Sequence, residues 1–248
     1  MIPLKDNIPI RRLPLITILL IVVNALVFGI DRLTGRSQAY LQLIRPGIYR
    51  QAEMFIGGIS QFWSMIPGNI IHSVPGSLWT LLSSMFLHAN WLHIGFNMLF
   101  LWVFGSNVED AIGRKKFIVF YLACGVVGGL CHIASEPASM VPTVGASGAI
   151  AGLMGAYLVL FPRAEILTIV PVFFFGAVMD VPVAVVIGFS AVIQYVNAKW
   201  LGGAMMQDGG IAYFAHLGGF LSGALFIILM GGRKLSESKM RNAVQPTI

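Results

Sequence analysis

Two side chains inside apolar stretches have the types needed for acyl-transfer chemistry. Ser147 lies in the run V-G-A-S-G-A-I-A-G-L-M-G, where Gly145 and Gly148 leave room for a substrate backbone, and a serine hydroxyl becomes a nucleophile when a base reaches it. His216, in A-Y-F-A-H-L-G-G-F-L-S-G, carries an imidazole that can act as that base. Each residue alone also fits a structural role, because small and polar residues in apolar segments serve helix packing. The chemistry therefore requires elements that bring the two side chains together.

A third apolar stretch, F-L-H-A-N-W-L-H-I-G-F-N, supplies His88, His93 and Asn97. His93 and Asn97 are four residues apart and so share one face of a helix, where Asn97 can take part in chemistry or join helices by hydrogen bonding. His88 is at the edge of the stretch, which favours interfacial hydrogen bonding and a structural role. His72 and His132 have no evident partners, and we interpret both as structural.

A metal site built from His88 and His93 is rejected. Their i, i+5 spacing makes the side chains diverge by about 140° on a helix of 3.6 residues per turn, and the Glu of the H-E-x-x-H zinc motif is missing. The two cysteines, Cys124 and Cys131, are separated by about 10 Å along one predicted helix, which is too far for a disulfide. Neither a metal nor another cofactor is expected.

The composition is that of a membrane protein. Hydrophobic residues make up 57% of the chain and charged residues only 10%, and the mean hydropathy is +0.82, so the chain is predicted to be a polytopic membrane protein and not a soluble globule. The formal net charge of +6 resides mainly in the loops and tails. That distribution indicates membrane topology and argues against nucleic acid as a partner.

Six apolar segments are predicted to cross the membrane: 13–30, 90–108, 117–133, 145–161, 181–197 and 211–230. Residues 31–87 are expected to form an interfacial loop with short amphipathic helices, and residues 166–179 an interfacial or re-entrant segment. The predicted fold class is an all-α membrane protein, a six-helix bundle with a long, partly helical first loop. Its one domain covers residues 13–232, between cytoplasmic tails at 1–12 and 233–248.

The lysines and arginines predict the orientation. A six-span chain with both ends in the cytoplasm places 11 of its 16 lysines and arginines on the cytoplasmic side, as the positive-inside rule favours. The second, fourth and sixth spans then run in the same direction, from outside to inside. Polar residues early in each span share one depth near the outer face, so Ser147, His216, His93 and Asn97 are expected to meet there.

Small residues allow two of these spans to pack closely against each other. Gly148 and Gly152 form a G-x-x-x-G pair beside Ser147, and the sixth span has small residues at the same spacing, with Gly219 and Gly223 beside His216. Close packing of these two faces would bring His216 to Ser147, which is the arrangement a serine–histidine pair needs.

Through four motifs that occur in the same order, the sequence resembles the rhomboid family of intramembrane serine proteases. The resemblance covers about residues 13–230. The motifs are H-x-x-x-x-H-x-x-x-N, E-x-x-x-G-x-x-x-F, G-x-S-G and A-H-x-x-G-x-x-x-G. In this sequence they fall on His88, His93 and Asn97; on Glu109, Gly113 and Phe117; on Gly145, Ser147 and Gly148; and on Ala215, His216, Gly219 and Gly223.

The resemblance implies hydrolysis of peptide bonds in or next to transmembrane segments by a Ser147–His216 dyad. It implies that the Ser147 amide, Asn97 and His93 form an oxyanion hole, with Gly145 and Gly148 also contacting the substrate. The Gly-rich loop at 202–210 looks like the family's cap over the site, and no acidic third member is expected, because Asp208 lies in that loop and Asp180 at the opposite membrane face.

Two positions depart from the family pattern. The first loop often has Trp-Arg, whereas this chain has Trp79-Thr80, so the usual arginine that anchors the loop is missing. Many members also have an aromatic residue four positions after the serine, beneath the histidine, and here that residue is Ala151. The first departure concerns loop anchoring and the second the packing around His216.

The expected partners are transmembrane protein substrates and the lipid bilayer. The expected location is a prokaryotic cell (inner) membrane, with an organelle left open. Two alternatives stand beside the protease: a catalytically inactive rhomboid-like protein that binds transmembrane segments, and a transporter or channel. The intact serine and histidine argue against the first, and the absence of a sequence repeat argues against the second.

Overall fold

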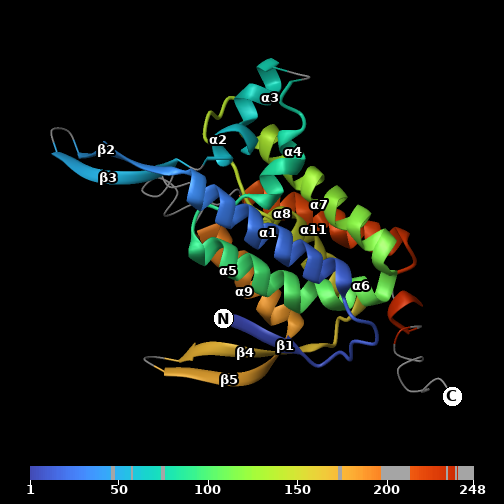
Figure 1. The fold of residues 1–248 in the computed structure, drawn as a ribbon. Helices are drawn as coiled ribbons and strands as arrows, with labels where there is room; N and C mark the ends of the chain where they lie inside the picture. The colour runs from blue at the N-terminus through green and yellow to red at the C-terminus, as the bar shows by residue number, and fades with distance from the viewer. Residues whose placement is uncertain are drawn as a thin grey trace.

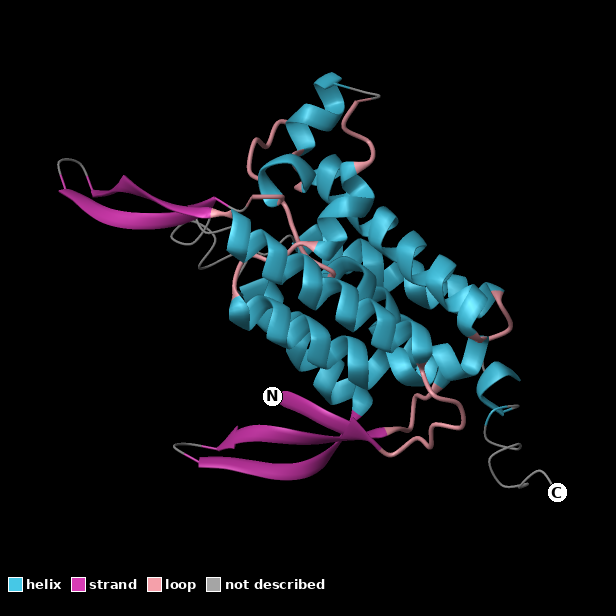
Figure 2. Ribbon diagram, in the orientation of Figure 1, coloured by secondary structure: helices cyan, strands magenta, loops and turns pink. Residues whose placement is uncertain are grey.

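The computed structural model describes residues 1–45, 48–56, 58–73, 76–172, 175–196, 213–232, 234–237 and 239. Helices form its body, and strands form two separate hairpin regions at its periphery (Figure 2). The predicted cap loop, with Gly202, Gly203, Met205, Met206, Gly209 and Gly210, lies outside the described residues.

Each of the six predicted apolar segments contains a helix. They are α1 (Leu15–Thr34), α5 (Trp91–Phe100) continuing through the π-helical turn η2 (Leu101–Gly105) into α6 (Ser106–Ile112), α7 (Arg114–Ser135), α8 (Ser147–Leu160), α9 (Val183–Val196) and α11 (Tyr213–Leu229). Within the described residues, α1 and α7 are long and apolar enough to cross a bilayer, and α8, α9 and α11 are shorter apolar helices. These expectations of helix are confirmed.

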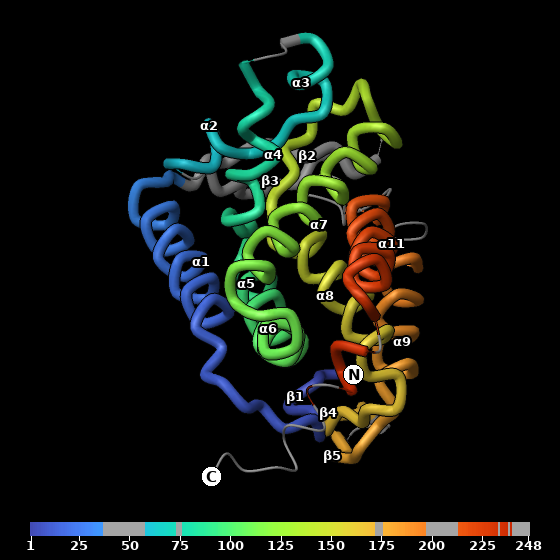
Figure 3. Tube along the Cα trace, turned by 90° about the vertical axis from the view of Figure 1, so that its right-hand side faces the viewer, coloured from blue at the N-terminus to red at the C-terminus, as the bar shows by residue number. Residues whose placement is uncertain are grey.

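The helix α8 lies at the centre of the bundle, between α5 on one side and α9 and α11 on the other (Figure 3). Nearly all of its side chains are buried, and it packs against α11 and α7. A helix that is apolar all round suits this position, because no face has to meet water.

The contact between α8 and α11 is made backbone to backbone through glycines. A Cβ added to Gly219 would lie 2.0 Å from the carbonyl oxygen of Gly148, and a Cβ added to Gly223 would lie 2.0 Å from that of Gly152. Any side chain at either position would force the helices apart. The predicted packing of the two small faces is therefore present.

The loop at 31–87 contains the expected short helices, α2 (Ser60–Trp63), α3 (Pro67–Ser73), α4 (Thr80–Ser83) and the 3-10 turn η1 (Ser84–Phe86). It also contains an antiparallel hairpin, β2 (Arg36–Arg45) and β3 (Ile48–Ile56), that projects from the bundle (Figure 1). The sequence analysis missed this hairpin. The signal was a Pro-Gly dipeptide between two runs with partial polar–apolar alternation.

The segment expected to be interfacial or re-entrant is a second hairpin, β4 (Glu165–Val172) and β5 (Phe175–Pro182). It joins β1 (Ile2–Asp6) in an antiparallel sheet of order β1-β4-β5. The all-α fold class is therefore wrong in this detail, because two small sheets accompany the helices. Runs of Ile, Val and Thr prefer strands when no helical period directs one face inward.

A backbone bridge anchors the first loop where the usual arginine is missing. Met65 and Thr143 exchange hydrogen bonds, with Met65 N donating to Thr143 O (3.1 Å) and Thr143 N donating to Met65 O (2.7 Å). Thr80 itself is buried, and its hydroxyl donates to the carbonyl oxygen of Ser77 (2.7 Å). The loop is thus held by main-chain pairing to the segment that leads into α8.

Glu109 joins the end of α6 to the start of α1. Its carboxylate accepts hydrogen bonds from the amides of Ile16 (3.0 Å) and Thr17 (2.8 Å) and from the Thr17 hydroxyl (2.8 Å). A carboxylate at a helix N-terminus satisfies amides that have no intrahelical acceptor. Gly113, with φ +81°, makes the turn into α7, and the fully buried Phe117 packs in the core.

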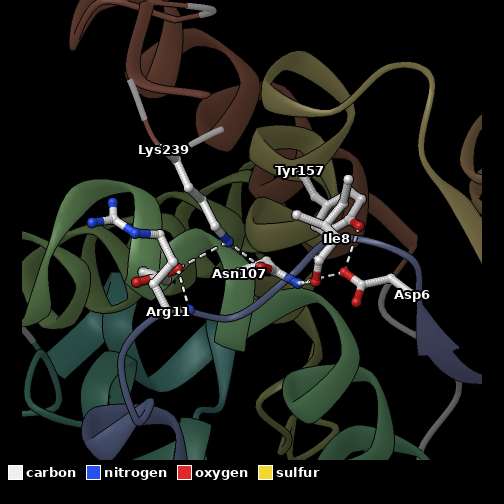
Figure 4. Close-up of polar contacts among 7 residues, drawn as sticks. Asp6, Ile8, Arg11, Asn107, Tyr157 and Lys239 are labelled. Carbon is white, nitrogen blue, oxygen red and sulfur yellow. Dashed lines mark hydrogen bonds and ion pairs between the residues drawn. The ribbon is translucent and has the colours of Figure 1, made fainter. Parts of the chain in front are cut away.

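A polar cluster ties both ends of the chain to the bundle (Figure 4). Asp6 Oδ2 accepts hydrogen bonds from the Tyr157 hydroxyl and from Asn107 Nδ2, both at 2.5 Å. Lys239 Nζ donates to Asn107 Oδ1 and pairs with Asp110 Oδ2 at 3.1 Å. Strand β1, within the expected tail at 1–12, and Lys239, within the expected tail at 233–248, are therefore both held against the bundle.

Gly223→Ala is expected to destabilise the protein, because the new methyl group meets backbone and not a movable side chain. Overpacking of this kind costs roughly 1–3 kcal/mol. Gly188→Ala on α9 is the matched control, since nothing lies within 4 Å of its added Cβ, and alanine raises helix propensity. Thermal unfolding in detergent micelles measures both, and equal stability of the two variants would contradict the backbone contact.

The polar cluster predicts a pH dependence of stability. Burial raises the pKa of the Asp6 carboxyl above its ordinary 3.8, against the opposing hydrogen bonds from Tyr157 and Asn107. The stability that this shift contributes is complete below the ordinary value and is lost as pH rises through the raised one. Asp6→Asn removes this titration and keeps an acceptor oxygen.

The melting temperature of the wild type should therefore fall relative to that of Asp6→Asn as the pH rises above the ordinary carboxyl pKa and through the raised pKa of Asp6. A constant difference across that range would show that the Asp6 carboxyl is not the titrating group.

Candidate active site

Ser147 is the first residue of the central helix α8. The amide of Ile150 donates to the carbonyl of Ala146 at 3.0 Å, which leaves the amides that precede it, including that of Ser147, without an intrahelical acceptor. The partial positive charge of the helix N-terminus also favours negative charge at this point. The hydroxyl and the backbone amide of Ser147 therefore both lie in the positive field of the helix N-terminus.

His216 lies on α11 and reaches Ser147 across the glycine contact. Its Nε2 atom is 2.6 Å from Ser147 Oγ, although the two residues are 69 positions apart. This is hydrogen-bond distance for a hydroxyl that donates to an imidazole nitrogen. The structure thus brings together the two side chains that sequence analysis singled out.

Gly145 allows His93 to approach the serine. Its φ of +128° lies in the region that favours glycine. A Cβ on Gly145 would lie 2.9 Å from Cε1 and Nε2 of His93 and 3.6 Å from Ser147 Oγ. The Gly145 amide donates to the carbonyl of Ser84 at 2.9 Å, which fixes this turn. His93, Gly145 and Ser147 are therefore neighbours.

Asn97 is buried one turn further along α5. Its Nδ2 atom has no hydrogen-bond partner among the described residues. A buried amide donor without a partner is costly, and at a reaction site it is available to a ligand. Asn97 lines the same cavity as the serine and the two histidines.

The cavity has a volume of about 590 Å³ and is bordered by α5, α8, α9 and α11. Its polar lining includes Asn90, His93, Asn97, Ser147, Gln194 and His216. Its apolar lining includes Phe96, Phe100, Ile150, Met154, Phe189 and Ile193. The space combines a few polar groups at one region with an apolar wall, as ligand sites commonly do.

His88 contacts His93 edge to face, with ring centroids 5.2 Å apart. The two rings do not diverge as the spacing on one helix predicts, because His88 lies before α5, whose N-cap is Asn90. Asn90 Oδ1 accepts a hydrogen bond from the His93 amide at 2.8 Å. Among the described residues, no group of three or more His, Cys, Asp or Glu side chains is placed to hold a metal ion.

His132 has a partner that the sequence did not reveal. Its Nε2 atom is 3.1 Å from the Thr143 hydroxyl, so it links α7 to the segment before α8. His72 is exposed on α3 and lies outside the cavity lining. Both described cysteines are free, as their spacing predicted.

Gln194 on α9 is the site residue that sequence analysis missed. Its Oε1 atom is 2.5 Å from Nδ1 of His216, so the imidazole is held at both nitrogens. A single glutamine in an otherwise apolar segment was the available signal, because polar residues in such segments usually have a partner. Ala151, the second departure from the family pattern, is buried and also lines the cavity.

The comparisons with known proteins agree on one family. The family model described as Rhomboid domain matches residues 75–233. The chain is 32% identical over 151 residues to Rhomboid protein 1, mitochondrial, of Saccharomyces cerevisiae. The aligned region covers 59% of this chain and 40% of that protein. It is 36% identical over 146 residues to Rhomboid protease GluP of Bacillus subtilis, covering 58% of this chain and 27% of that protein.

A plant relative extends the match further along the chain. Rhomboid-like protein 11, chloroplastic, of Arabidopsis thaliana is 29% identical over 192 residues, 77% of this chain and 64% of that protein. The chain thus spans less than two thirds of each of these relatives. Because they are bacterial, mitochondrial and chloroplastic, they do not single out the expected prokaryotic membrane. With more than half of its length matched by the family model, the chain belongs to the rhomboid family of integral membrane proteins.

Proposed function

We propose that the protein is a serine endopeptidase that cleaves peptide bonds in or next to transmembrane segments of other membrane proteins. The observation that carries the proposal is the 2.6 Å contact between Ser147 Oγ and His216 Nε2 inside the cavity. One matched relative is named a rhomboid protease. The mechanism below follows from these groups.

His216 acts first as a general base. Its Nε2 takes the hydroxyl proton while Ser147 Oγ bonds to the carbonyl carbon of the substrate and the carbonyl oxygen becomes an oxyanion. The protonated imidazole then gives that proton to the leaving amine as the carbon–nitrogen bond breaks. Water, deprotonated by the same imidazole, hydrolyses the resulting acyl-enzyme and regenerates the serine hydroxyl.

Three donors surround the position where the oxyanion forms. They are the Ser147 amide, Asn97 Nδ2 and His93 Nε2. The amide of Ala89 donates to His93 Nδ1 at 3.4 Å, so that nitrogen is the acceptor and Nε2 of the neutral ring carries the proton. The Nε2 side of His93 faces Gly145, two residues before Ser147. Preorganised donors of this kind commonly supply the largest part of the stabilisation of an oxyanion.

The short central helix allows hydrolysis at membrane depth. In the proposed arrangement, α1, α5–α6, α7, α8, α9 and α11 are six spans of one domain at 13–232, with both chain ends in the cytoplasm. The 14 residues of α8 measure about 21 Å, less than the roughly 30 Å hydrocarbon core. Ser147 at the outer end of α8 then lies below the membrane surface, in a cavity that admits water.

The apolar wall of the cavity fits the substrate class. Phe96 and Phe100 on α5 and Phe189 and Ile193 on α9 line it from opposite sides. An apolar transmembrane segment matches such a wall, whereas a soluble polar peptide does not. We propose that substrates arrive from the lipid side, between α5 and α9.

Ser147→Ala and His216→Ala are expected to abolish both cleavage of a single-span model substrate and labelling by a fluorophosphonate. Each change removes one member of the reacting pair. Ser222→Ala is the matched control, because that serine is buried on α11 and donates to the Gly219 carbonyl, away from the cavity lining. Wild-type cleavage by the Ser147→Ala protein, purified from a host without other such proteases, would refute the mechanism.

Asn97→Ala is expected to slow cleavage and not to abolish it. Loss of one oxyanion donor costs about 2.7–4 kcal/mol of barrier, or roughly 100- to 1,000-fold in kcat. Asn24→Ala provides the control, since Asn24 is also a buried asparagine but donates to the Leu20 carbonyl within α1. An unchanged kcat in Asn97→Ala would remove Asn97 from the oxyanion hole.

A further inference from the structure

We propose that Gln194 of α9 is a positioning residue that holds His216 in the tautomer and orientation required of a general base. The proposal concerns the contact itself, and its effect on rate rests on the proposed protease function. Gln194 touches no reacting atom and acts only through the imidazole.

The two contacts of His216 decide its tautomer together. Gln194 Oε1 lies 2.5 Å from Nδ1, and Ser147 Oγ lies 2.6 Å from Nε2. A carbonyl oxygen can only accept a hydrogen bond, so Nδ1 carries the proton. Nε2 is then left with a lone pair directed at the serine hydroxyl, which is the form that can remove its proton.

The surroundings of Gln194 explain why a glutamine stands there. Its helical neighbours Val192, Tyr195 and Val196 are exposed on the surface of the bundle, while Gln194 is partly buried. An amide in such apolar surroundings is costly without a hydrogen-bond partner. His216 is a partner with the matching donor.

Gln194 also supports the imidazole of His216 at a place where the described residues provide neither an acidic partner nor an aromatic ring. Among the described hydrogen bonds, His216 has no carboxylate partner, and the side chain of Ala151 ends at its Cβ. The titratable groups that act on His216 are His93 on α5 and His132 on α7. The neutral amide therefore accepts from Nδ1 both before and after Nε2 takes the serine proton, and it favours the positively charged ring.

The first test compares rates of fluorophosphonate labelling for wild type, Gln194→Met, Gln194→Glu and Val192→Met. The probe is small and reacts with the serine directly, so changes in the passage of a transmembrane substrate beside α9 do not affect it. Gln194→Met preserves size but lacks the acceptor and should lower the rate roughly 10- to 100-fold, as expected for loss of a hydrogen bond to a charged group. Val192→Met, an exposed position on the same helix outside the cavity lining, should label like wild type.

Gln194→Glu supplies the conservative rescue. A carboxylate accepts at Nδ1 and favours the protonated ring, so labelling should exceed that of Gln194→Met and the acidic limb of its pH profile should move to higher pH. This movement reports that the side chain at position 194 contacts the imidazole, and the lower rate of Gln194→Met reports its positioning role. Wild-type labelling in Gln194→Met, or labelling in Gln194→Glu below that of Gln194→Met, would overturn the proposal.

The second test needs no activity. The side-chain ¹⁵N resonances of His216 in micelles should show a proton on Nδ1 in the wild type and should lose that pattern in Gln194→Met. A proton on Nε2 of the neutral wild-type ring would refute the proposed contact even in an active protease. A proton on Nδ1 in a protein that neither cleaves nor labels would retain the contact and refute the protease function.

Discussion

The direct contact between the backbones of α8 and α11 is the constraint on which the rest of the site depends. Gly148 and Gly152 face Gly219 and Gly223 so closely that a single Cβ would lie 2.0 Å from a carbonyl oxygen. Ser147 and His216 belong to these same helices and meet at 2.6 Å. A displacement of about 1 Å is enough to disturb reacting groups, so helix packing and chemistry are one requirement here.

The central helix also connects the two ends of the bundle. Its first residue, Ser147, belongs to the candidate active site, and Tyr157 near its other end donates to Asp6 in the polar cluster. Asn107 and Lys239 extend that cluster to α6 and to the C-terminal part of the chain. The sheet β1-β4-β5 lies at the same end (Figure 3). One end of α8 thus carries the candidate active site, and the other end anchors the polar cluster.

The helices were predictable because an apolar run of membrane length has few other stable forms. The β4–β5 hairpin was not, because an apolar run of its length does not distinguish strand from buried helix. The β2–β3 hairpin carried only a weak signal, a Pro-Gly dipeptide between two partly alternating runs. The pairing of β1 with β4 joins residues more than 150 positions apart, and no local pattern carries that information. The bridge between Met65 and Thr143, which anchors the first loop, also joins residues that are far apart in sequence.

The sequence by itself determined which residue types stand at Ser147, His93, Asn97 and His216, and helical periodicity together with charge predicted that they share one depth. Tertiary structure alone decided what each one touches. Gln194 reaches His216 because α9 lies beside α11, and His88 meets His93 because the chain turns before α5 begins. Spacing along a chain predicts neighbours only within one regular element, whereas these contacts join different elements or cross a turn.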